Sequence, residues 1–159
     1  MSGRALPTVV VRRARPDDLA AVQRLLTDAA LPIDGVEQHF GGFLVAVTAP
    51  GVVGAIGVES YGPFGLLRSA VVERDSQGRG IGALLTLRVL NDARARGLSA
   101  VYLLTTTAAD YFTRFGFRRI ARGDVAKELW QSAELQGACP ETASVLMLPL
   151  SEKPAGVEA

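Results

Sequence analysis

The chain has 159 residues, 48% of them hydrophobic, and a net charge of +1, which predicts one globular domain with a proper core. The small net charge excludes nucleic-acid binding by bulk charge, and no apolar run or N-terminal segment has the character of a membrane span or a signal peptide. One cysteine and one histidine exclude an internal disulfide and a Cys- or His-rich metal site, so we expect a cytoplasmic protein without a metal.

The N-terminal part of the chain predicts a strand followed by a helix. The strand is predicted at 8–14, where valines cluster. Pro16 suits the first position of a helix, and the acids at 17–18 suit the positive end of its dipole. Apolar side chains then recur at helical spacing, at Leu19, Val22, Leu25 and Leu26. A turn at 31–35 ends this helix, and we expect a short second helix at about 36–40.

Three strands joined by short turns are predicted next, at 43–47, 52–61 and 66–72. Regular antiparallel pairing across the second turn places Glu59 opposite Arg68. One side of the sheet then carries Gly57, Glu59, Tyr61, Arg68 and Ala70. The other, more apolar side carries Ile56, Val58, Leu67 and Val71. A β-bulge in either strand would change this register.

The second half of the chain alternates helices and strands. A helix predicted at 80–96 ends at Gly97, which suits the position after a helix C-terminus. The apolar segment 100–106 predicts a buried strand parallel to its neighbour. We then expect a helix at 107–116, a strand at 117–121, a helical stretch at 125–135 and a last strand at 144–150. Residues 1–150 would form one domain, with 151–159 as a disordered tail.

The segment 77–82, between a predicted strand and a predicted helix, reads Gln-Gly-Arg-Gly-Ile-Gly. A glycine-rich turn in this position can bind phosphate, because amides at the helix start point at the anion and glycines let the backbone approach it. A P-loop would need Lys-Ser or Lys-Thr after the last glycine, and neither is present. Gly78-x-Gly80-x-x-Ala83 fits the dinucleotide-binding pattern, but the next strand lacks the acid that this pattern requires. A glycine turn without a ligand is the remaining alternative.

The pattern Gln77-x-x-Gly80-x-Gly82 after an apolar strand resembles the acetyl-coenzyme-A site of the GNAT acetyltransferases. Phe112-x-x-x-Gly116-Phe117 and the order of the predicted elements resemble the same family over nearly the whole chain. The resemblance implies an α/β fold, with a mixed sheet of about six to seven strands flanked by roughly four to five helices. It also implies acetyl-CoA as the cosubstrate, with no metal.

Three shorter segments carry a narrower resemblance: 65–69, 103–108 and Cys139-Pro140-x-x-Ala143. They resemble the GNAT enzymes encoded in arsenic-resistance operons, the ArsN type. Segment 103–108 is also similar to the acetyltransferase domain of N-acetylglutamate synthases. Both comparisons imply a small amino-acid-like acceptor, such as a glutamate analogue of the phosphinothricin or arsinothricin type.

The GNAT resemblance implies roles for two backbone segments and two side chains. The amides of Ala70, Val71 and Val72 would bind the pantetheine arm and polarise the thioester carbonyl, as an oxyanion hole does. The pyrophosphate would be held mainly by the backbone of Gln77, Gly78, Arg79, Gly80, Ile81, Gly82 and Ala83. Phe112 would line the pantetheine channel. Many GNAT enzymes have a tyrosine there as the general acid; here the tyrosine is Tyr111, one residue earlier, and it is the candidate acid.

Glu59 is the candidate general base, because an acceptor amine must be neutral to attack. Arg68 would bind an acceptor carboxylate, and Tyr61 would lie on the same face as a further substrate contact. The alternative is that Glu59 and Arg68 form only a cross-strand ion pair. Glu73 is the second candidate base.

Four further residues have simpler interpretations. Cys139 suggests thiol binding of arsenite, but one thiol is a poor chelator and buried cysteines commonly act as small hydrophobes. We expect His39 to be exposed and without a catalytic role. Trp130 and Tyr102 are expected in the core.

The resemblance therefore implies an acetyl-CoA-dependent N-acetyltransferase that transfers acetyl directly to the primary amine of a small molecule. No serine or cysteine has a nearby histidine that would suggest an acyl-enzyme. The alternatives are a non-catalytic acyl-CoA sensor, an enzyme like N-acetylglutamate synthase, and a protein N-terminal acetyltransferase. Neither nucleic acid nor membrane is expected as a partner, and a homodimer stays open as the assembly.

Overall fold

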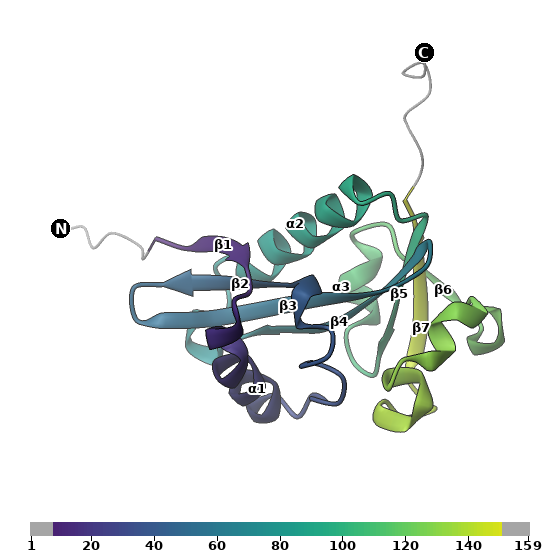
Figure 1. The fold of residues 1–159 in the computed structure, drawn as a ribbon, viewed down its shortest axis with the longest axis horizontal. Helices are drawn as coiled ribbons and strands as arrows, with labels where there is room; N and C mark the ends of the chain where they lie inside the picture. Colours follow the sequence, from purple (N-terminus) through teal and green to yellow (C-terminus); the bar gives the residue numbers. More distant parts are fainter. Residues whose placement is uncertain (1–7, 151–159) are drawn as a thin grey trace, which may run out of the picture. The chain divides into compact units, whose positions relative to one another are not determined.

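The computed structural model describes residues 8–150 (Figure 1). Its strands form a mixed sheet in the order β1-β2-β3-β4-β5-β7-β6, which confirms the predicted α/β fold. The strands are β1 (Val10–Arg13), β2 (Phe43–Thr48), β3 (Gly51–Tyr61), β4 (Phe64–Val72), β5 (Ala100–Thr105), β6 (Arg118–Ile120) and β7 (Ser144–Pro149). Strands β4 and β5 are parallel, as predicted. The predicted disordered tail at 151–159 lies outside the described residues.

The two longest helices lie where the sequence predicts them, and the shorter helical segments differ from the prediction. The α-helices are α1 (Leu19–Asp28), α2 (Ile81–Ala95) and α3 (Ala109–Thr113). Shorter helical segments are η1 (Pro16–Asp18), η2 (Phe40–Gly42), η3 (Arg74–Ser76), η4 (Arg122–Asp124), η5 (Lys127–Gln131) and η6 (Glu134–Ala138). No helix in this described part of the chain is long and apolar enough to cross a membrane.

Two helix predictions differ from the structure. The helix expected at 36–40 is wrong, because the chain forms turns there and then the single turn η2, which contains two glycines. Glycine disfavours a helix by about 1 kcal/mol relative to alanine. The stretch expected at 125–135 is instead divided into η5 and η6, because the backbone of Ser132 between them is extended, with a ψ of 140°.

Contacts divide the chain into two units that share strands β3 and β4. The first unit comprises the chain up to Gly57 together with Ser69–Val89. Its core packs one side of α1 against β2 and β3, through Val22, Leu26, Phe43, Val45 and Ala55. Gly57 belongs to this packing, since any side chain there would collide with the Phe43 ring.

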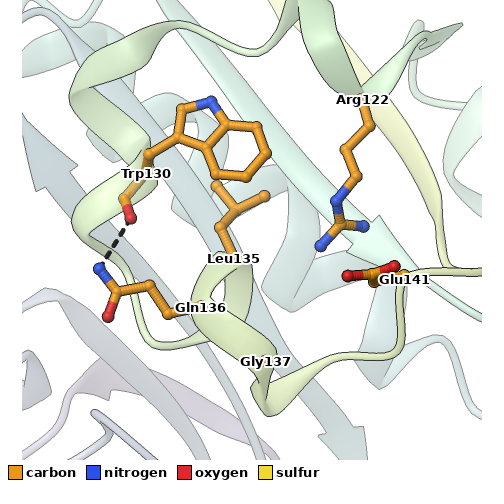
Figure 2. Close-up of a pocket in the computed structure, with 6 residues that line it drawn as sticks. All are labelled: Arg122, Trp130, Leu135, Gln136, Gly137 and Glu141. Atoms are coloured by element: carbon orange, nitrogen blue, oxygen red, sulfur yellow. Dashed lines mark hydrogen bonds between the residues drawn. The ribbon is translucent and has the colours of Figure 1, made fainter.

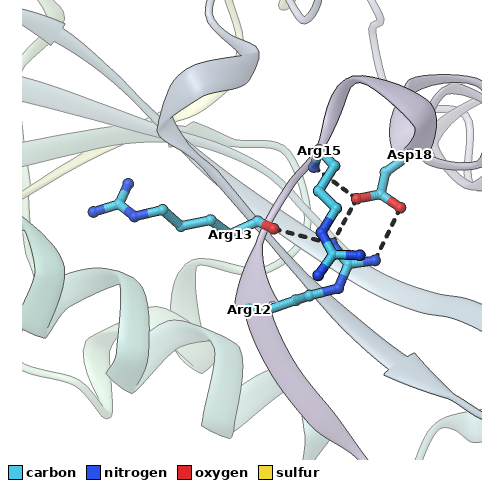
Figure 3. Close-up of polar contacts among 4 residues, drawn as sticks. All are labelled: Arg12, Arg13, Arg15 and Asp18. Atoms are coloured by element: carbon cyan, nitrogen blue, oxygen red, sulfur yellow. Dashed lines mark hydrogen bonds and ion pairs between the residues drawn. The ribbon is translucent and has the colours of Figure 1, made fainter.

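The start of α1 is fixed by a charged contact with β1 (Figure 3). Asp18 accepts hydrogen bonds from the Arg15 amide at 2.7 Å and from Arg12 Nη1 at 2.8 Å. The hydrogen bond from Arg12 lowers the pKa of Asp18, although burial opposes this effect. Asp18 therefore ties the start of the helix to the preceding strand, although its side chain caps no amide of α1.

The second unit comprises Val58–Arg68 together with the chain from Leu90 onward. Strand β5 pairs with β4 on one side and with β7 on the other, and β7 also pairs with β6. The segment 122–138 covers one face of these strands, where Leu129 and Leu135 pack with Leu66 and Tyr102. Tyr102 is buried, as predicted, whereas Trp130 is 38% exposed and its predicted place in the core is wrong.

Strand β4 contains an irregularity at Ser69 that the sequence did not predict. Ser69 has a φ of 62°, in the left-handed region that residues other than glycine seldom adopt. Beyond it, Val71 packs with Ala55 and Val45 and not on the side of Ile56, where we placed it. The alternation of side chains is thus reversed after Ser69, which also moves Ala70 to the side opposite from the predicted one.

Candidate functional site

The glycine loop, residues 77–80, leads from β4 and η3 into α2. Gly78 has a φ of 84° and Gly80 a φ of 81°, a conformation that glycine adopts without steric cost. A Cβ atom at either position would have no atom within 4 Å. The backbone of the loop is therefore open on the side where a side chain would otherwise stand.

Both ends of the glycine loop are anchored to the first unit. The Gln77 side-chain amide donates to the carbonyl of Val72 at 2.9 Å. Ile81, the first residue of α2, is 4% exposed, and Gly54 of β3 lets it approach that strand closely. The first bond of the helix runs from the Leu84 amide to the Gly80 carbonyl at 3.0 Å.

The start of α2 offers the chemistry of an anion site. The amides of Ile81, Gly82 and Ala83 precede the first intrahelical bond, so the helix gives them no carbonyl partner. These donors and the positive end of the helix dipole favour a phosphate group beside the glycine loop. The segment therefore has donors that a phosphate could accept from, and its role in binding the coenzyme stays a prediction.

The second unit contains a buried charge cluster, formed by Glu59, Arg68, Glu134 and Tyr61. Arg68 Nη1 donates to Glu59 Oε2 at 2.7 Å, and Arg68 Nε lies 3.5 Å from Glu134 Oε2. The side chain of Arg68 is 0% exposed, and those of Glu59 and Glu134 are 1% and 5% exposed. The ion pair predicted between Glu59 and Arg68 is present, and Glu134 is a second acid that we did not predict.

Tyr61 completes the hydrogen bonding of Glu59. Its hydroxyl donates to Glu59 Oε1 at 2.5 Å. Burial, reinforced by this hydrogen bond, raises the pKa of Tyr61 to about 12, so the phenol keeps its proton at neutral pH. Both carboxylate oxygens of Glu59 therefore accept a hydrogen bond within the cluster. Its role as general base stays a prediction.

A sequence model described as an acetyltransferase (GNAT) domain matches residues 39–119, just over half of the chain. The chain belongs to the GNAT acetyltransferase family. The matched region contains the glycine loop, Glu59 and Arg68. No curated protein sequence matches this chain.

Solved structures similar to this GNAT chain include two complexes with coenzyme A. Rv2747 from Mycobacterium tuberculosis, with CoA and a second ligand, is 26% identical with a TM-score of 0.76, over 88% of this chain and 98% of that one. N-acetylglutamate synthase from Neisseria gonorrhoeae, with CoA and N-acetyl-glutamate, is 19% identical with a TM-score of 0.76. That match covers 93% of this chain but 36% of the synthase, so this chain spans about a third of it. A GNAT acetyltransferase from Staphylococcus aureus is 16% identical with a TM-score of 0.74, over 91% and 100% of the two chains.

Tyr111 and Phe112 of this GNAT chain differ in burial, although their rings meet edge-on at 5.1 Å. Phe112 is 5% exposed, and its ring lies 5.9 Å from that of Phe117. Tyr111 is half-buried, its ring meets Phe115 edge-on at 5.3 Å, and the Arg114 guanidinium lies 5.8 Å from its centroid. A step of one residue rotates a helical side chain by about 100°, so the two rings do not occupy equivalent places.

We expect Tyr111→Phe to lower turnover by about a hundredfold at most and to leave measurable activity. General acid catalysis typically contributes about 10²–10⁴-fold. We expect the low end of this range, because a thiol with a pKa near 8.5 leaves tolerably as a thiolate without an acid. Steady-state CoA release with the best acceptor measures the effect, and Phe112→Tyr is the companion variant that should be tolerated. Undetectable turnover in Tyr111→Phe with acetyl-CoA binding intact would make this tyrosine indispensable and refute the estimate.

Cys139 lies beside the buried charge cluster, and its thiol is expected to be unreactive at neutral pH. Burial, followed by the charge of Glu134, raises the pKa of its thiol from 9.0 to about 12. At neutral pH the side chain is therefore a protonated, half-buried thiol. This agrees with the simpler interpretation of Cys139 as a small hydrophobe.

We expect Cys139 in the folded protein to react with iodoacetamide about a thousandfold more slowly than in urea, because the thiolate is the reactive species. The rate should rise only as the pH approaches the raised pKa of about 12. Cys139→Ser should leave turnover unchanged. Rapid alkylation at neutral pH with the fold intact, or loss of turnover in the serine variant, would show that the thiol has a role.

The predicted site residues fall into two groups by unit. The glycine loop, Ala70, Val71 and Val72 belong to the first unit, whereas Glu59, Tyr61, Arg68, Tyr111 and Phe112 belong to the second. The structure brings Glu59, Arg68 and Tyr61 together, and it adds Glu134, whose amide donates to the Ser132 hydroxyl at 3.2 Å. The one signal for Glu134 was an acid between Ala133 and Leu135, in a stretch that we expected to be helical.

Proposed function

We propose that this chain is an acetyl-CoA-dependent N-acetyltransferase that acts on the primary amine of a small amino-acid-like molecule. The observation that carries the proposal is the glycine loop, whose two left-handed glycines open directly onto the first turn of α2. Membership of the family indicates the class of reaction, and the loop has the backbone donors that would bind a coenzyme pyrophosphate.

The residues present fit this cosubstrate. The amides of Ile81, Gly82 and Ala83 would bind the pyrophosphate, with Arg79 adding positive charge. The parallel pairing of β4 with β5 runs from Phe64 to Leu67, and Ala70 to Val72 lie beyond it. We propose that backbone amides of this part of β4 bind the pantetheine arm and polarise the thioester carbonyl.

The proposed transfer is direct. The neutral amine attacks the thioester carbonyl carbon, the C–N bond forms, the C–S bond breaks, and the amine loses one proton while the coenzyme leaves as thiolate or thiol. Glu59 is the proposed base, acting directly or through water, and Tyr111 the proposed acid. Tyr61 and Arg68 are the proposed acceptor contacts, although both are now seen in the buried charge cluster.

For the acceptor we propose a glutamate analogue of the phosphinothricin or arsinothricin type, in an arsenic- or toxin-resistance context. The support is the ArsN-type resemblance of three segments and the likeness to an N-acetylglutamate synthase fold. A cytoplasmic location and a homodimer are further proposals, and they follow from the composition and the family alone.

A CoA-release assay tests the function. The full chain is incubated with acetyl-CoA and a panel of amino acids, glutamate analogues and a short peptide with a free N-terminus. We expect release above the background hydrolysis rate with at least one small amine, and mass spectrometry should find the product heavier by one acetyl group. If the peptide is the one substrate in the panel that is acetylated, the protein is instead a protein N-terminal acetyltransferase.

A non-catalytic acyl-CoA sensor is the second candidate, and one observation favours it. The position four residues before Gly116, where many members of the family have their tyrosine, is the buried Phe112. Tight binding of acetyl-CoA by calorimetry, together with no CoA release for any amine in the panel, would select this alternative.

A further inference from the structure

A cavity of about 460 Å³ lies within the second unit, between the segments that precede β7 (Figure 2). Its lining residues are Arg122, Trp130, Leu135, Gln136, Gly137 and Glu141. The volume falls in the range of about 300–1,000 Å³ typical of small-molecule sites. None of these residues belongs to the proposed acetyl-transfer machinery.

Arg122 provides an uncommitted positive charge in this cavity. Its Nη1 atom is buried and has no hydrogen-bond partner within the part of the chain that the structure describes. The guanidinium is held by the face of Trp130, whose centroid lies 5.9 Å from Cζ. A buried guanidinium nitrogen without an acceptor is costly unless a ligand supplies one, and a carboxylate is the acceptor that matches its geometry.

Glu141 provides the opposite charge at the same cavity. Its side chain is exposed, and in Figure 2 its carboxylate lies beside the Arg122 guanidinium, across the cavity from Trp130 and Leu135. Figure 2 shows no hydrogen bond between the two charged groups, and Arg122 Nη1 has no partner within residues 8–150. The cavity thus presents a cation, an anion and an apolar wall as separate features.

Hydrogen bonds and core packing position the apolar wall of the cavity. The indole N–H of Trp130 donates to the Val125 carbonyl at 3.4 Å, and the Gln136 side-chain amide donates to the Trp130 carbonyl at 2.9 Å. Leu135 is 5% exposed and belongs to the core of the second unit. These contacts fix the apolar surface against which a ligand body would pack.

We infer that this cavity binds a free amino acid with an apolar side chain. The α-carboxylate would pair with Arg122 and the α-ammonium with Glu141. An amino acid carries these two groups on the same carbon atom, and the two protein charges lie side by side at one end of the cavity, so both pairs could form together. The side chain would pack on Trp130 and Leu135. Glu141 repels a second carboxylate, so glutamate binds less tightly than leucine.

Trp130 is the single tryptophan of the chain, so its fluorescence reports on this cavity alone. Titration of the full chain with L-leucine, without coenzyme, is expected to change the emission and to saturate. N-acetyl-leucine lacks the ammonium and leucinamide lacks the carboxylate, and each is expected to bind at least tenfold more weakly. Trp130→Phe removes the signal and serves as the optical control.

Arg122→Gln is expected to weaken leucine binding at least tenfold. The matched control is Arg119→Gln, because Arg119 is a nearby exposed arginine whose ion pair with Asp110 is also exposed. That variant should bind leucine as the parent does. Glu141→Gln should weaken leucine binding but leave N-acetyl-leucine unaffected.

Two results would overturn the inference: no saturable response to leucine at millimolar concentration by fluorescence or calorimetry, or equal leucine affinity in the parent and Arg122→Gln. CoA release with leucine then distinguishes an acceptor from an effector, since an acceptor is consumed and an effector is not. The binding test is independent of the proposed acetyl transfer, because it needs neither coenzyme nor turnover.

Discussion

Gly80→Asp is expected to abolish acetyl-CoA binding. Gly80 precedes the first turn of α2 and has a φ of 81°. An aspartate there brings a negative charge to the place where we propose the pyrophosphate, and it adds a side chain where the backbone is open. Calorimetry with acetyl-CoA should show binding in the micromolar range for the parent and no detectable heat for the variant.

Gly97→Asp is the matched control for this variant. Gly97 follows the other end of α2 and has a φ of 83°, and a Cβ atom added there would likewise meet no atom within 4 Å. The two substitutions therefore impose the same backbone strain, and they differ in which end of the helix they charge. Gly80→Asn adds a side chain of similar size without its negative charge, and this variant should still bind acetyl-CoA weakly. Equal affinity of Gly80→Asp and the parent would refute the assignment of the glycine loop.

Arg68→Met is expected to lower the free energy of unfolding by about 3–5 kcal/mol, because it leaves two buried carboxylates without their cation. The side chain of Arg68 is 0% exposed and lies between Glu59 and Glu134. For a chain of this size the loss corresponds to a melting temperature lower by about 6–20 °C. Urea denaturation and thermal melting measure both quantities.

Arg96→Met provides the control, because Arg96 forms a partly exposed ion pair with Asp92 at 3.0 Å. Surface pairs contribute about 0.2–1 kcal/mol. Adding Glu59→Gln and Glu134→Gln to Arg68→Met should restore part of the lost stability. A loss below about 1 kcal/mol in Arg68→Met would contradict the buried charge cluster as a stabilising unit.

Glu59→Gln separates the two roles considered for this acid. If Glu59 serves only the ion pair, the variant should melt at a lower temperature while turnover per folded molecule stays unchanged. If it also serves as the base, turnover per folded molecule should fall as well, because an amide cannot take up the proton of the amine. The melting temperature should fall in both cases, since glutamine has one accepting oxygen where Glu59 uses two, one for Arg68 and one for Tyr61.

The features predicted well from sequence are those with local causes. The glycine loop could be recognised because a strand, the glycines and a helix start follow one another within about 20 residues of sequence. The contact between Glu59 and Arg68 followed from pairing across one short turn. Strand positions followed from alternation and from glycine and proline at the turns.

The features missed have causes that lie elsewhere in the chain. A serine in the left-handed region gives no local signal, so the reversal after Ser69 and the true face of Val71 could not be predicted. Glu134 reaches Arg68 from an irregular segment that lacks helical periodicity. The cavity at Arg122 and Trp130 depends on the same segment, and no spacing in the sequence places these two side chains together.

The buried charge cluster also constrains how this sequence can diverge. Substitution of Arg68 alone leaves two buried carboxylates without a cation, and substitution of either acid leaves the buried guanidinium with one carboxylate fewer. Each single substitution therefore destabilises the fold and is selected against. Replacement of all three by apolar residues of similar volume is often neutral or stabilising. Positions 59, 68 and 134 should therefore covary among relatives: an apolar residue at 68 should occur with uncharged residues at both other positions, and chains that keep one acid without the arginine should be rare.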